Sequence, residues 1–433
     1  MRTKLFLLGS SLLTVGLVGC NWTEFDDLEA DTWISVQGQP NDDSTDFGVA
    51  LARGARDTSA GGGGSIAVLG SGQAQYMRLQ YSATGSVDVR SALELNAQFG
   101  VGNLDLQPVL MADPATDEIS LVATTGGDQV TVLHGNENLV DRQIFGPRQA
   151  FAATYMIAPR SDMPGMVTPS FPIVAAGPDE TISALYPGPF APFVYPNPAP
   201  KCNVKKDNGD AVNIRGVGAA FVTSTTHHDV VVWSADGDLL IYDGLIFEAQ
   251  NSTACPMMDP TQGNATPLAA KPTVSTGFAP GRGSQIIMYQ DRYAILVGHK
   301  GLTNPDSYLS VWDIGGATGA PVKIGATIAV PGLRSAAILE NGSDRYVVAG
   351  YPADLVESTK AGRVQVYPFS LTDGLNAESV LTLHDASPES EQQFGRALAV
   401  TEFNGTPVIA VAADNEVFFY FRTALYGETR EGK

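Results

Sequence analysis

Short runs of apolar residues, separated by turns rich in Gly and Pro, recur along this chain of 433 residues. The clearest example runs from Leu333 to Phe369 and has three parts. A strand rich in small apolar residues comes first, and a second strand ends in Gly350-Tyr351-Pro352. After a loop, Val364 and Val366 belong to a third strand with alternating polarity. Self-similarity with a period of several tens of residues indicates a propeller, a solenoid or an array, because one unit cannot bury its own apolar faces.

The same phrase returns in order along nearly all of the chain. Its first part opens with a Phe-Gly pair at Phe47-Gly48, Phe99-Gly100, Phe145-Gly146 and Phe394-Gly395. Weaker equivalents stand at Gly216, Gly283 and Gly332, which makes seven units. This phrase resembles the FG-GAP repeat of integrin α-type β-propellers. The resemblance implies an all-β fold, a seven-bladed β-propeller over residues 31–425.

A strand-like run near the N-terminus has no partner of its own. It contains Trp33, Ile34 and Val36, whereas the last unit has three clear strands and ends at Val417–Phe421. A propeller exposes strand edges unless its first and last blades join. We therefore predict that Trp33, Ile34 and Val36 close the ring on the last blade. The alternative is an ordinary N-terminal edge strand.

The N-terminus has the pattern of an export signal. Arg2 and Lys4 precede an apolar run that continues to Val18, too short for a comfortable membrane span. The sequence Leu17-Val18-Gly19-Cys20 resembles the lipobox of bacterial lipoproteins. This resemblance implies a signal peptide over residues 1–19, acylation of Cys20 and a lipidated tether over residues 20–30. A plain signal peptide with a chance Cys is the alternative.

The resemblance to lipoproteins also bears on location. Residue 21 is Asn and not the Asp that favours inner-membrane retention in many Gram-negative lipoproteins. We expect an outer-membrane lipoprotein of the bacterial cell envelope, either facing the periplasm or exposed at the surface. Several acyl chains would anchor it stably, whereas one chain anchors only marginally.

The chain is acidic, with a formal charge of −20. Removing residues 1–19 takes away Arg2 and Lys4, so −20 − 2 gives −22 for the mature chain. Such a surface opposes binding to nucleic acid and to anionic headgroups, and we expect no nucleic-acid partner. The 46 Gly and 27 Pro suit many tight turns, and residues 426–433 form a polar tail.

Two cysteines remain after Cys20 is assigned to the anchor. Cys202 and Cys255 lie in Pro-rich insertions, over residues 186–206 and 250–271. An even pair in an exported chain favours a disulfide, so we predict a bridge between them. Two free thiols or a metal pair are the alternatives. The insertions are expected to be irregular and to form the variable binding surface.

No familiar catalytic motif is present, whether a Gly-x-Ser-x-Gly elbow, a zinc helix or a Walker loop. His227-His228-Asp229 is expected to form a polar hairpin tip, because adjacent residues of a strand point to opposite faces. The run Gly61–Gly64 reads as a flexible loop. Trp312-Asp313 reads as a strand-end Trp followed by a turn Asp.

Integrin-type repeats often carry calcium loops, and calcium needs six to eight oxygen ligands. The corresponding hairpins here have few carboxylates, and we read them as solvated turns; they are residues 236–238, 290–292, 340–344 and 402–406. Asp113, Asp117 and Glu118 are the candidate calcium ligands, although their spacing departs from the motif. No other cofactor is expected.

Two classes of function fit these patterns. The favoured one is an outer-membrane-anchored lipoprotein whose propeller is a non-catalytic platform for a protein or glycan partner, in adhesion or envelope assembly. The alternative is a propeller enzyme, a hydrolase or lyase acting on an envelope glycan or lipid. Two carboxylates within about 5–10 Å of each other in a concave pocket would favour the enzyme.

Overall fold

The structure is a computed structural model, and every element in the part that it describes is a β-strand. No helix occurs there, and so none that could cross a membrane. The described residues are 33–37, 47–56, 64–70, 75–81, 87–94, 109–112, 119–125, 129–135, 141–145, 149–157, 170–177, 181–184 and 201–421, the last range without 207, 211, 224–226, 243–267, 270, 282, 301–305, 316–319, 357–359, 379–380, 386–391, 404–405 and 415.

The described strands form seven sheets, of which the first three come from the N-terminal half. The first sheet contains β2 (Phe47–Arg56), β3 (Gly64–Gly70), β4 (Gln75–Tyr81) and β5 (Val87–Glu94). The second contains β6 (Val109–Ala112), β7 (Ile119–Thr125), β8 (Gln129–Gly135) and β9 (Asp141–Phe145). The third contains β10 (Gln149–Ile157), β11 (Ser170–Gly177), β12 (Thr181–Ala184), β13 (Lys201–Lys205) and the short β17 (Leu268–Ala269).

Four more sheets follow. The fourth contains β14 (Ile214–Ala220), β15 (Asp229–Ser234), β16 (Asp238–Tyr242) and β18 (Lys271–Ser275), and the fifth β19 (Gln285–Tyr289), β20 (Tyr293–His299), β21 (Ser307–Asp313) and β22 (Val322–Ala329). The sixth contains β23 (Ser335–Asn341), β24 (Asp344–Tyr351), β25 (Arg363–Ser370), β26 (Gly374–Leu375) and β27 (Leu381–Leu383). The seventh contains β28 (Ala397–Phe403), β29 (Thr406–Ala413), β30 (Glu416–Phe421) and β1 (Trp33–Gln37).

Neighbouring strands within a sheet follow one another in sequence and pair antiparallel, apart from β1 and from the parallel pair of β13 and β17. The phrase read from the sequence has three strands, but six of the sheets add an outer strand from the same unit, such as β22 of the fifth sheet. Much of β22 is exposed, because it lies at a sheet edge. A strand with one solvated side does not need a strong apolar pattern, and this is why the sequence did not reveal it.

The N-terminal strand β1 supplies the outer strand of the seventh sheet. It pairs antiparallel with β30, and Trp33 lies opposite Tyr420 while Val36 lies opposite Val417. The first and last described strands of the chain therefore belong to one sheet, in which β1 covers the edge that β30 would otherwise expose.

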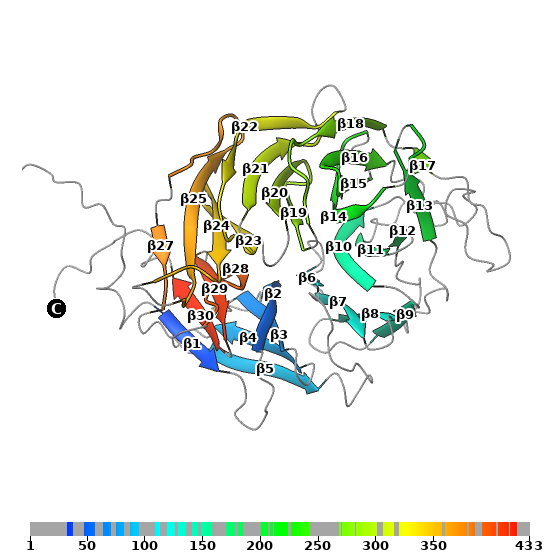
Figure 1. The fold of residues 1–433 in the computed structure, drawn as a ribbon. Coiled ribbons are helices and arrows are strands. Elements are labelled where there is room, and N and C mark those ends of the chain that lie inside the picture. The colour runs from blue at the N-terminus through cyan, green and yellow to red at the C-terminus, as the bar shows by residue number, and fades with distance from the viewer. Residues whose placement is uncertain are drawn as a thin grey trace, which may run out of the picture.

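The sheets stand side by side around a common centre (Figure 1). Contacts between first strands link β2 to β6, β6 to β10, β10 to β14 and β14 to β19. They continue from β19 to β23 and from β23 to β28, and β28 returns to β2. The order of these contacts around the centre is therefore the order of the sheets in the chain.

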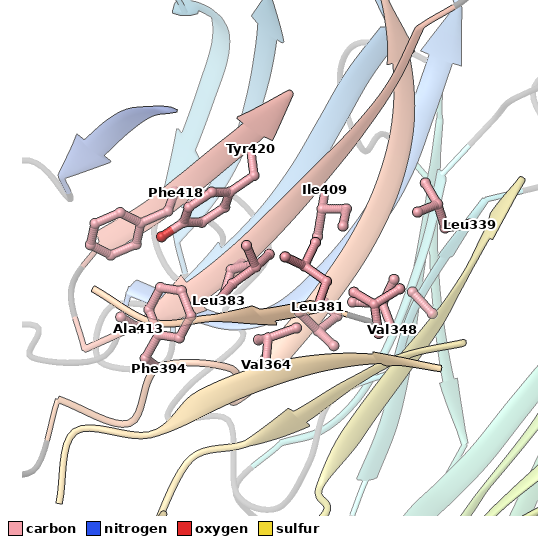
Figure 2. Packing of buried hydrophobic residues seen from close by; sticks show 14 residues of the cluster. Leu339, Val348, Val364, Leu381, Leu383, Phe394, Ile409, Ala413, Phe418 and Tyr420 are labelled. Atoms are coloured by element: carbon pink, nitrogen blue, oxygen red, sulfur yellow. The ribbon is translucent and has the colours of Figure 1, made fainter. Parts of the chain in front are cut away.

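The core lies between the sheets. Figure 2 shows one layer, in which Val364 and Leu381 of the sixth sheet meet Ile409 and Phe418 of the seventh. Alternate residues of one strand enter different layers: Leu398 of β28 packs in this layer, whereas Ala399 packs towards the first sheet. Both faces of a sheet are thus covered, so its strands read as nearly continuous apolar runs. Fully burying a Val, Leu, Ile or Phe side chain in such a layer contributes roughly 1.5–3 kcal/mol to the free energy of folding.

The glycines of the repeated phrase occupy the start of the first strands. Gly48, Gly283, Gly332 and Gly395 all have a positive φ, between 84° and 89°. Gly216 differs, because it lies inside β14 and has no positive φ. A Cβ atom there would stand 3.1 Å from Ile286 of the next sheet, so this glycine permits close packing instead of a turn.

The two Pro-rich insertions are not irregular throughout. Residues 201–205 form β13, which pairs with β12, and residues 268–269 form β17. Their Pro residues lie upstream of these strands, so the final residues of each insertion can form the backbone hydrogen bonds of a sheet. The two final segments also pair with each other, with Val204 opposite Leu268.

Candidate functional site

The histidine pair singled out in the sequence is buried. These residues lie at the hairpin between β14 and β15, as expected, but His227, His228 and Asp229 have exposed fractions of only 6%, 2% and 0%. Asp229 begins β15, and its carboxylate accepts hydrogen bonds from the amide and the hydroxyl of Thr223, at 2.7 and 2.8 Å. The carboxylate therefore has a structural role, because it ties Thr223 to the start of β15.

His228 connects the fourth sheet to the fifth. Its Nε2 atom lies 3.6 Å from Oδ1 of Asp291, and its ring packs edge-on against Phe221 at 4.2 Å between centroids. The amide of Phe221 donates to the carbonyl of Asp291 at 2.7 Å. The loop after β14 and the turn after β19 therefore meet in one packed contact.

The acidic turn at residues 236–238 binds a partly exposed ammonium group. Lys206 Nζ donates to Asp236 at 2.9 Å and to Asp238 at 2.8 Å, and these bonds raise the pKa of Lys206. The sequence suggested a solvated turn, and the structure adds an ion pair with Lys206. The two carboxylates share one cation, and the contact joins the segment after β13 to the hairpin between β15 and β16.

The turn at residues 290–292 also carries an ion pair. Gln290 and Asp291 both have φ of 51°, which makes a tight hairpin turn. The next residue, Arg292, donates from two nitrogens to Asp313, at 2.9 and 2.6 Å. Asp313 is the last residue of β21, and Trp312 before it is buried and donates to Ser310. The Trp-Asp pair thus ends a strand and forms a structural ion pair.

A tyrosine connects the fifth sheet to the sixth. The hydroxyl of Tyr289 accepts hydrogen bonds from Gln290 and Arg345, and it donates to Glu340. Burial and the bond to Glu340 raise the pKa of Tyr289, against the opposite effect of Arg345. Glu340 is exposed, as expected for a solvated turn, but it and Arg345 also form polar contacts with Tyr289 of the neighbouring sheet.

The sequence analysis missed one buried polar group. His299 ends β20, where the sixth sheet has Tyr351, and it is fully buried. Its amide donates to Ser284 Oγ at 3.2 Å. Burial lowers the pKa of His299, and the charge of Arg334 lowers it further, while the backbone of Gly283 opposes both. The signal in the sequence was the alignment of Gly298-His299 with Gly350-Tyr351.

The structure places only some of the other candidates. Trp33, Ile34 and Val36 lie in β1, and Cys202 lies in β13 opposite Ile182. Cys20, Cys255, Asp113, Asp117, Glu118 and residues 61–63 lie outside the described residues. The anchor, the disulfide and the calcium ligands stay predictions. Within the described ranges, no group of three or more His, Cys, Asp or Glu side chains has the arrangement of a metal site.

The described polar clusters share one chemical character. Each joins neighbouring strands or neighbouring sheets through ion pairs or hydrogen bonds, as Lys206, Arg292 and Tyr289 do.

Comparison with known proteins gives a likeness in fold alone. No family model matches the sequence. No curated protein matches it either. A chain of the humanized mutant of the Chaetomium thermophilum Polycomb Repressive Complex 2, in a structure with the inhibitor GSK343, has a TM-score of 0.53 at 11% identity, over 90% of this chain and 97% of that one. A chain of the Chaetomium thermophilum complex bound to GSK126 has a TM-score of 0.51 at 12% identity, with the same coverage of 90% and 97%. These neighbours and the antiparallel sheets described above show an all-β, β-propeller-like fold.

Proposed function

We propose that this chain is an outer-membrane-anchored lipoprotein of the bacterial cell envelope. In this proposal a seven-bladed β-propeller of the FG-GAP, integrin α type is a non-catalytic platform that binds a protein or glycan partner. The membrane contact is the acylated Cys20, and adhesion or envelope assembly is the biological setting. The lipobox-like sequence Leu17-Val18-Gly19-Cys20 supports the anchor.

Support for seven blades comes from the sheets and from their contacts. Seven sheets follow one another in sequence order, and contacts of first strands lead from β2 through β28 and back to β2. The pairing of β1 with β30 supports closure of the ring by the N-terminal strand. Positive φ at Gly48 and Gly395 supports the FG-GAP type, because the Phe-Gly pair then has a backbone reason to recur.

The observation that carries the platform is the pairing of the two strands that follow the Pro-rich parts of the insertions. One leads into β13 and the other into β17, and these two strands pair with each other. Two long connections from neighbouring sheets thus arrive at the same place on a rigid scaffold. Binding residues are commonly found on such loops.

The anchor is tested by the substitution Cys20→Ser. We expect the variant to lose acylation and to move from the membrane fraction to the soluble fraction, as mass spectrometry and fractionation would show. The control is Cys202→Ser, which leaves the lipobox intact and should stay in the membrane. Unchanged processing and full retention of Cys20→Ser in membranes would refute the lipoprotein assignment.

The platform is tested by affinity co-purification from native membranes. We expect the tagged protein to retain a specific protein or glycan, and a variant with residues 186–200 replaced by a short Gly-Ser linker to lose it. The matched control replaces the polar tail at residues 426–433 and should keep the partner. Equal recovery from the linker variant would show that the insertion is not the binding surface.

A further inference from the structure

Each sheet has two ends, and the connections between strands divide between them. In an antiparallel sheet, the first and third strands end at one face of the ring, and the second and fourth strands end at the other. We call the face where first and third strands end the insertion face. Asp291 and Ser343 lie there, because they follow the first strands β19 and β23. We call the opposite one the glycine face; Gly48 and Gly395 mark it, because they stand at the start of first strands.

Hydrogen bonds between neighbouring sheets join like ends. At the insertion face, Phe221 donates to Asp291 of the next sheet. At the glycine face, Ser335 Oγ donates to the carbonyl of Gly395 at 2.7 Å, and Arg396 Nε donates to the carbonyl of Gly48 at 3.2 Å. The bond from Tyr289 to Glu340 joins the fifth and sixth sheets at the insertion face in the same way. One orientation around the ring is therefore shared by the fourth to seventh sheets and the first.

The third sheet has the same orientation. Its outer strand β13 runs parallel to β17, which leads into the outer strand β18 of the fourth sheet. Lys206, just after β13, binds Asp236 in the hairpin between β15 and β16, and both positions belong to the glycine face. The connections from β12 to β13 and from β16 to β17 consequently leave and re-enter at the insertion face.

The N-terminal segment enters at this same face. The third strand of the seventh sheet, β30, ends there at Phe421, and the antiparallel β1 begins opposite its end, with Trp33 paired to Tyr420. Cys20 precedes Trp33 by 33 − 20 = 13 residues, which reach at most about 45 Å when extended. Turning the glycine face to the anchor would use a further length of about one strand, roughly 17–26 Å for five to eight residues.

From this topology, and resting on the proposed acyl anchor, we infer that the insertion face of the ring is turned towards the membrane. The ends of β12 and β16, where the two long connections begin, then lie next to the bilayer, while the glycine face points away from it. The inference concerns the orientation of the whole domain, which neither the repeat nor the lipobox specifies.

The test uses two exposed residues on one strand of the sixth sheet. Ser343 precedes β24 at the insertion face, and Ala353 follows β24 at the glycine face. The acylated variants Ser343→Cys and Ala353→Cys receive a fluorescent label and are reconstituted in vesicles that contain a lipid with a nitroxide on its headgroup. The parent protein gives the labelling background of its own cysteines. Vesicles without nitroxide give the unquenched signal.

We expect the label at residue 343 to be quenched severalfold more than the label at residue 353. Equal quenching, or stronger quenching at residue 353, would overturn the orientation. Both labels also have to respond alike to a soluble quencher without vesicles, which shows that they are equally accessible.

A second anchor separates this inference from the lipoprotein proposal. In the same two variants, residues 1–20 are replaced by a polyhistidine tag and the protein is held on vesicles with nickel-chelating lipid. The same difference in quenching would support the orientation even if Cys20 proved not to be acylated. Equal quenching on this anchor would overturn the orientation even if acylation were confirmed.

Discussion

At the scale of single residues, the repeated glycine has a backbone role and not a chemical one. Gly395 has φ of 89° and lies in the turn just before β28, where its carbonyl accepts a bond from Ser335. A Cβ atom here would stand 2.9 Å from the carbonyl oxygen of Arg363 and 3.1 Å from Cα of Gly350. Phe394 before it is fully buried, so the Phe-Gly pair combines a core side chain with a turn.

The substitution Gly395→Ala should therefore destabilise the protein in two ways. The left-handed backbone costs about 1–2 kcal/mol for a residue with a Cβ atom, and the close contacts add about 1–3 kcal/mol. The control Gly209→Ala has a similar φ of 86° but nothing within 4 Å of its Cβ position, so it should suffer only the first effect. Urea unfolding measures both, and equal losses would contradict the packing argument.

Buried His299 should make stability depend on pH. Its folded pKa lies below the unfolded value of about 6.5, so the unfolded chain binds the proton first and stability falls as the pH drops below about 6.5. The limiting loss is about 1.4 kcal/mol per pH unit. His299→Phe should reduce the loss measured by urea unfolding between pH 7 and pH 5, whereas the control His384→Gln should keep it. An unchanged slope in His299→Phe would exclude this residue as its source.

At the scale of elements, the outer strands determine how the ring ends and where the insertions meet. β1 pairs with β30 along five residue pairs, from Trp33 opposite Tyr420 to Gln37 opposite Glu416. Without β1, the backbone groups of β30 on that side would form an open edge, which invites pairing with another chain. One short strand thus links residues that are almost 400 positions apart in the sequence.

Deletion of residues 31–37, with the signal and Cys20 kept, should destabilise the whole domain and promote aggregation. Trp33→Ala should act in the same direction but more mildly, because it leaves the backbone pairing of β1 with β30 in place. Thermal unfolding and light scattering provide the measurements, and deletion of residues 426–433 is the control. A wild-type melting temperature without added aggregation would show that β1 does not stabilise the ring.

The pairing of β13 with β17 bears on the two cysteines. Cys202 lies in β13, and the segment that contains Cys255 leads towards β17. We expect non-reducing peptide mapping of the exported protein to find Cys202 linked to Cys255. The same digest after reduction is the control. Recovery of both as freely alkylated thiols would exclude the bridge.

At the scale of the whole molecule, the net charge bears on how the protein could contact a membrane. The formal charge of the chain is −20, and it becomes −20 − 2 = −22 if residues 1–19 are removed as proposed. A protein of this charge repels anionic surfaces, so in the proposed lipoprotein membrane contact comes from the anchor and not from the surface of the domain. This separates an anchored platform from a protein that binds lipid headgroups or nucleic acid directly.

A variant without residues 1–20 should stay in solution when it is mixed with phosphatidylglycerol vesicles at low salt. It should also fail to retard duplex DNA in a gel. Both results follow from repulsion between like charges, which is strongest at low ionic strength. Co-sedimentation is the measurement, with cationic vesicles as the positive control. Binding to the anionic vesicles would reveal a basic patch that the net charge conceals.

The sequence by itself determined the all-β character of the protein and the order of its units. These features are local: an apolar run bounded by Gly or Pro reads as a strand wherever it occurs, as Val408–Ala412 and Val417–Phe421 do. The repeated phrase then indicates a ring or an array. For the same reason, the outer strands such as β22 escaped notice, because half-exposed strands have no strong pattern.

Tertiary structure alone decided what the polar residues do. His228 and Asp229 look like a polar hairpin tip in the sequence, yet both are buried, and Glu340 accepts a hydrogen bond from Tyr289 of the neighbouring sheet. Lys206 gives no local signal, and the only signal of His299 is its alignment with Tyr351, because the groups around both residues come from segments about 15 to 32 residues away. The orientation of the insertions and of β1 is likewise non-local. It depends on how strands pair across the ring, and a sequence pattern records only what each strand buries.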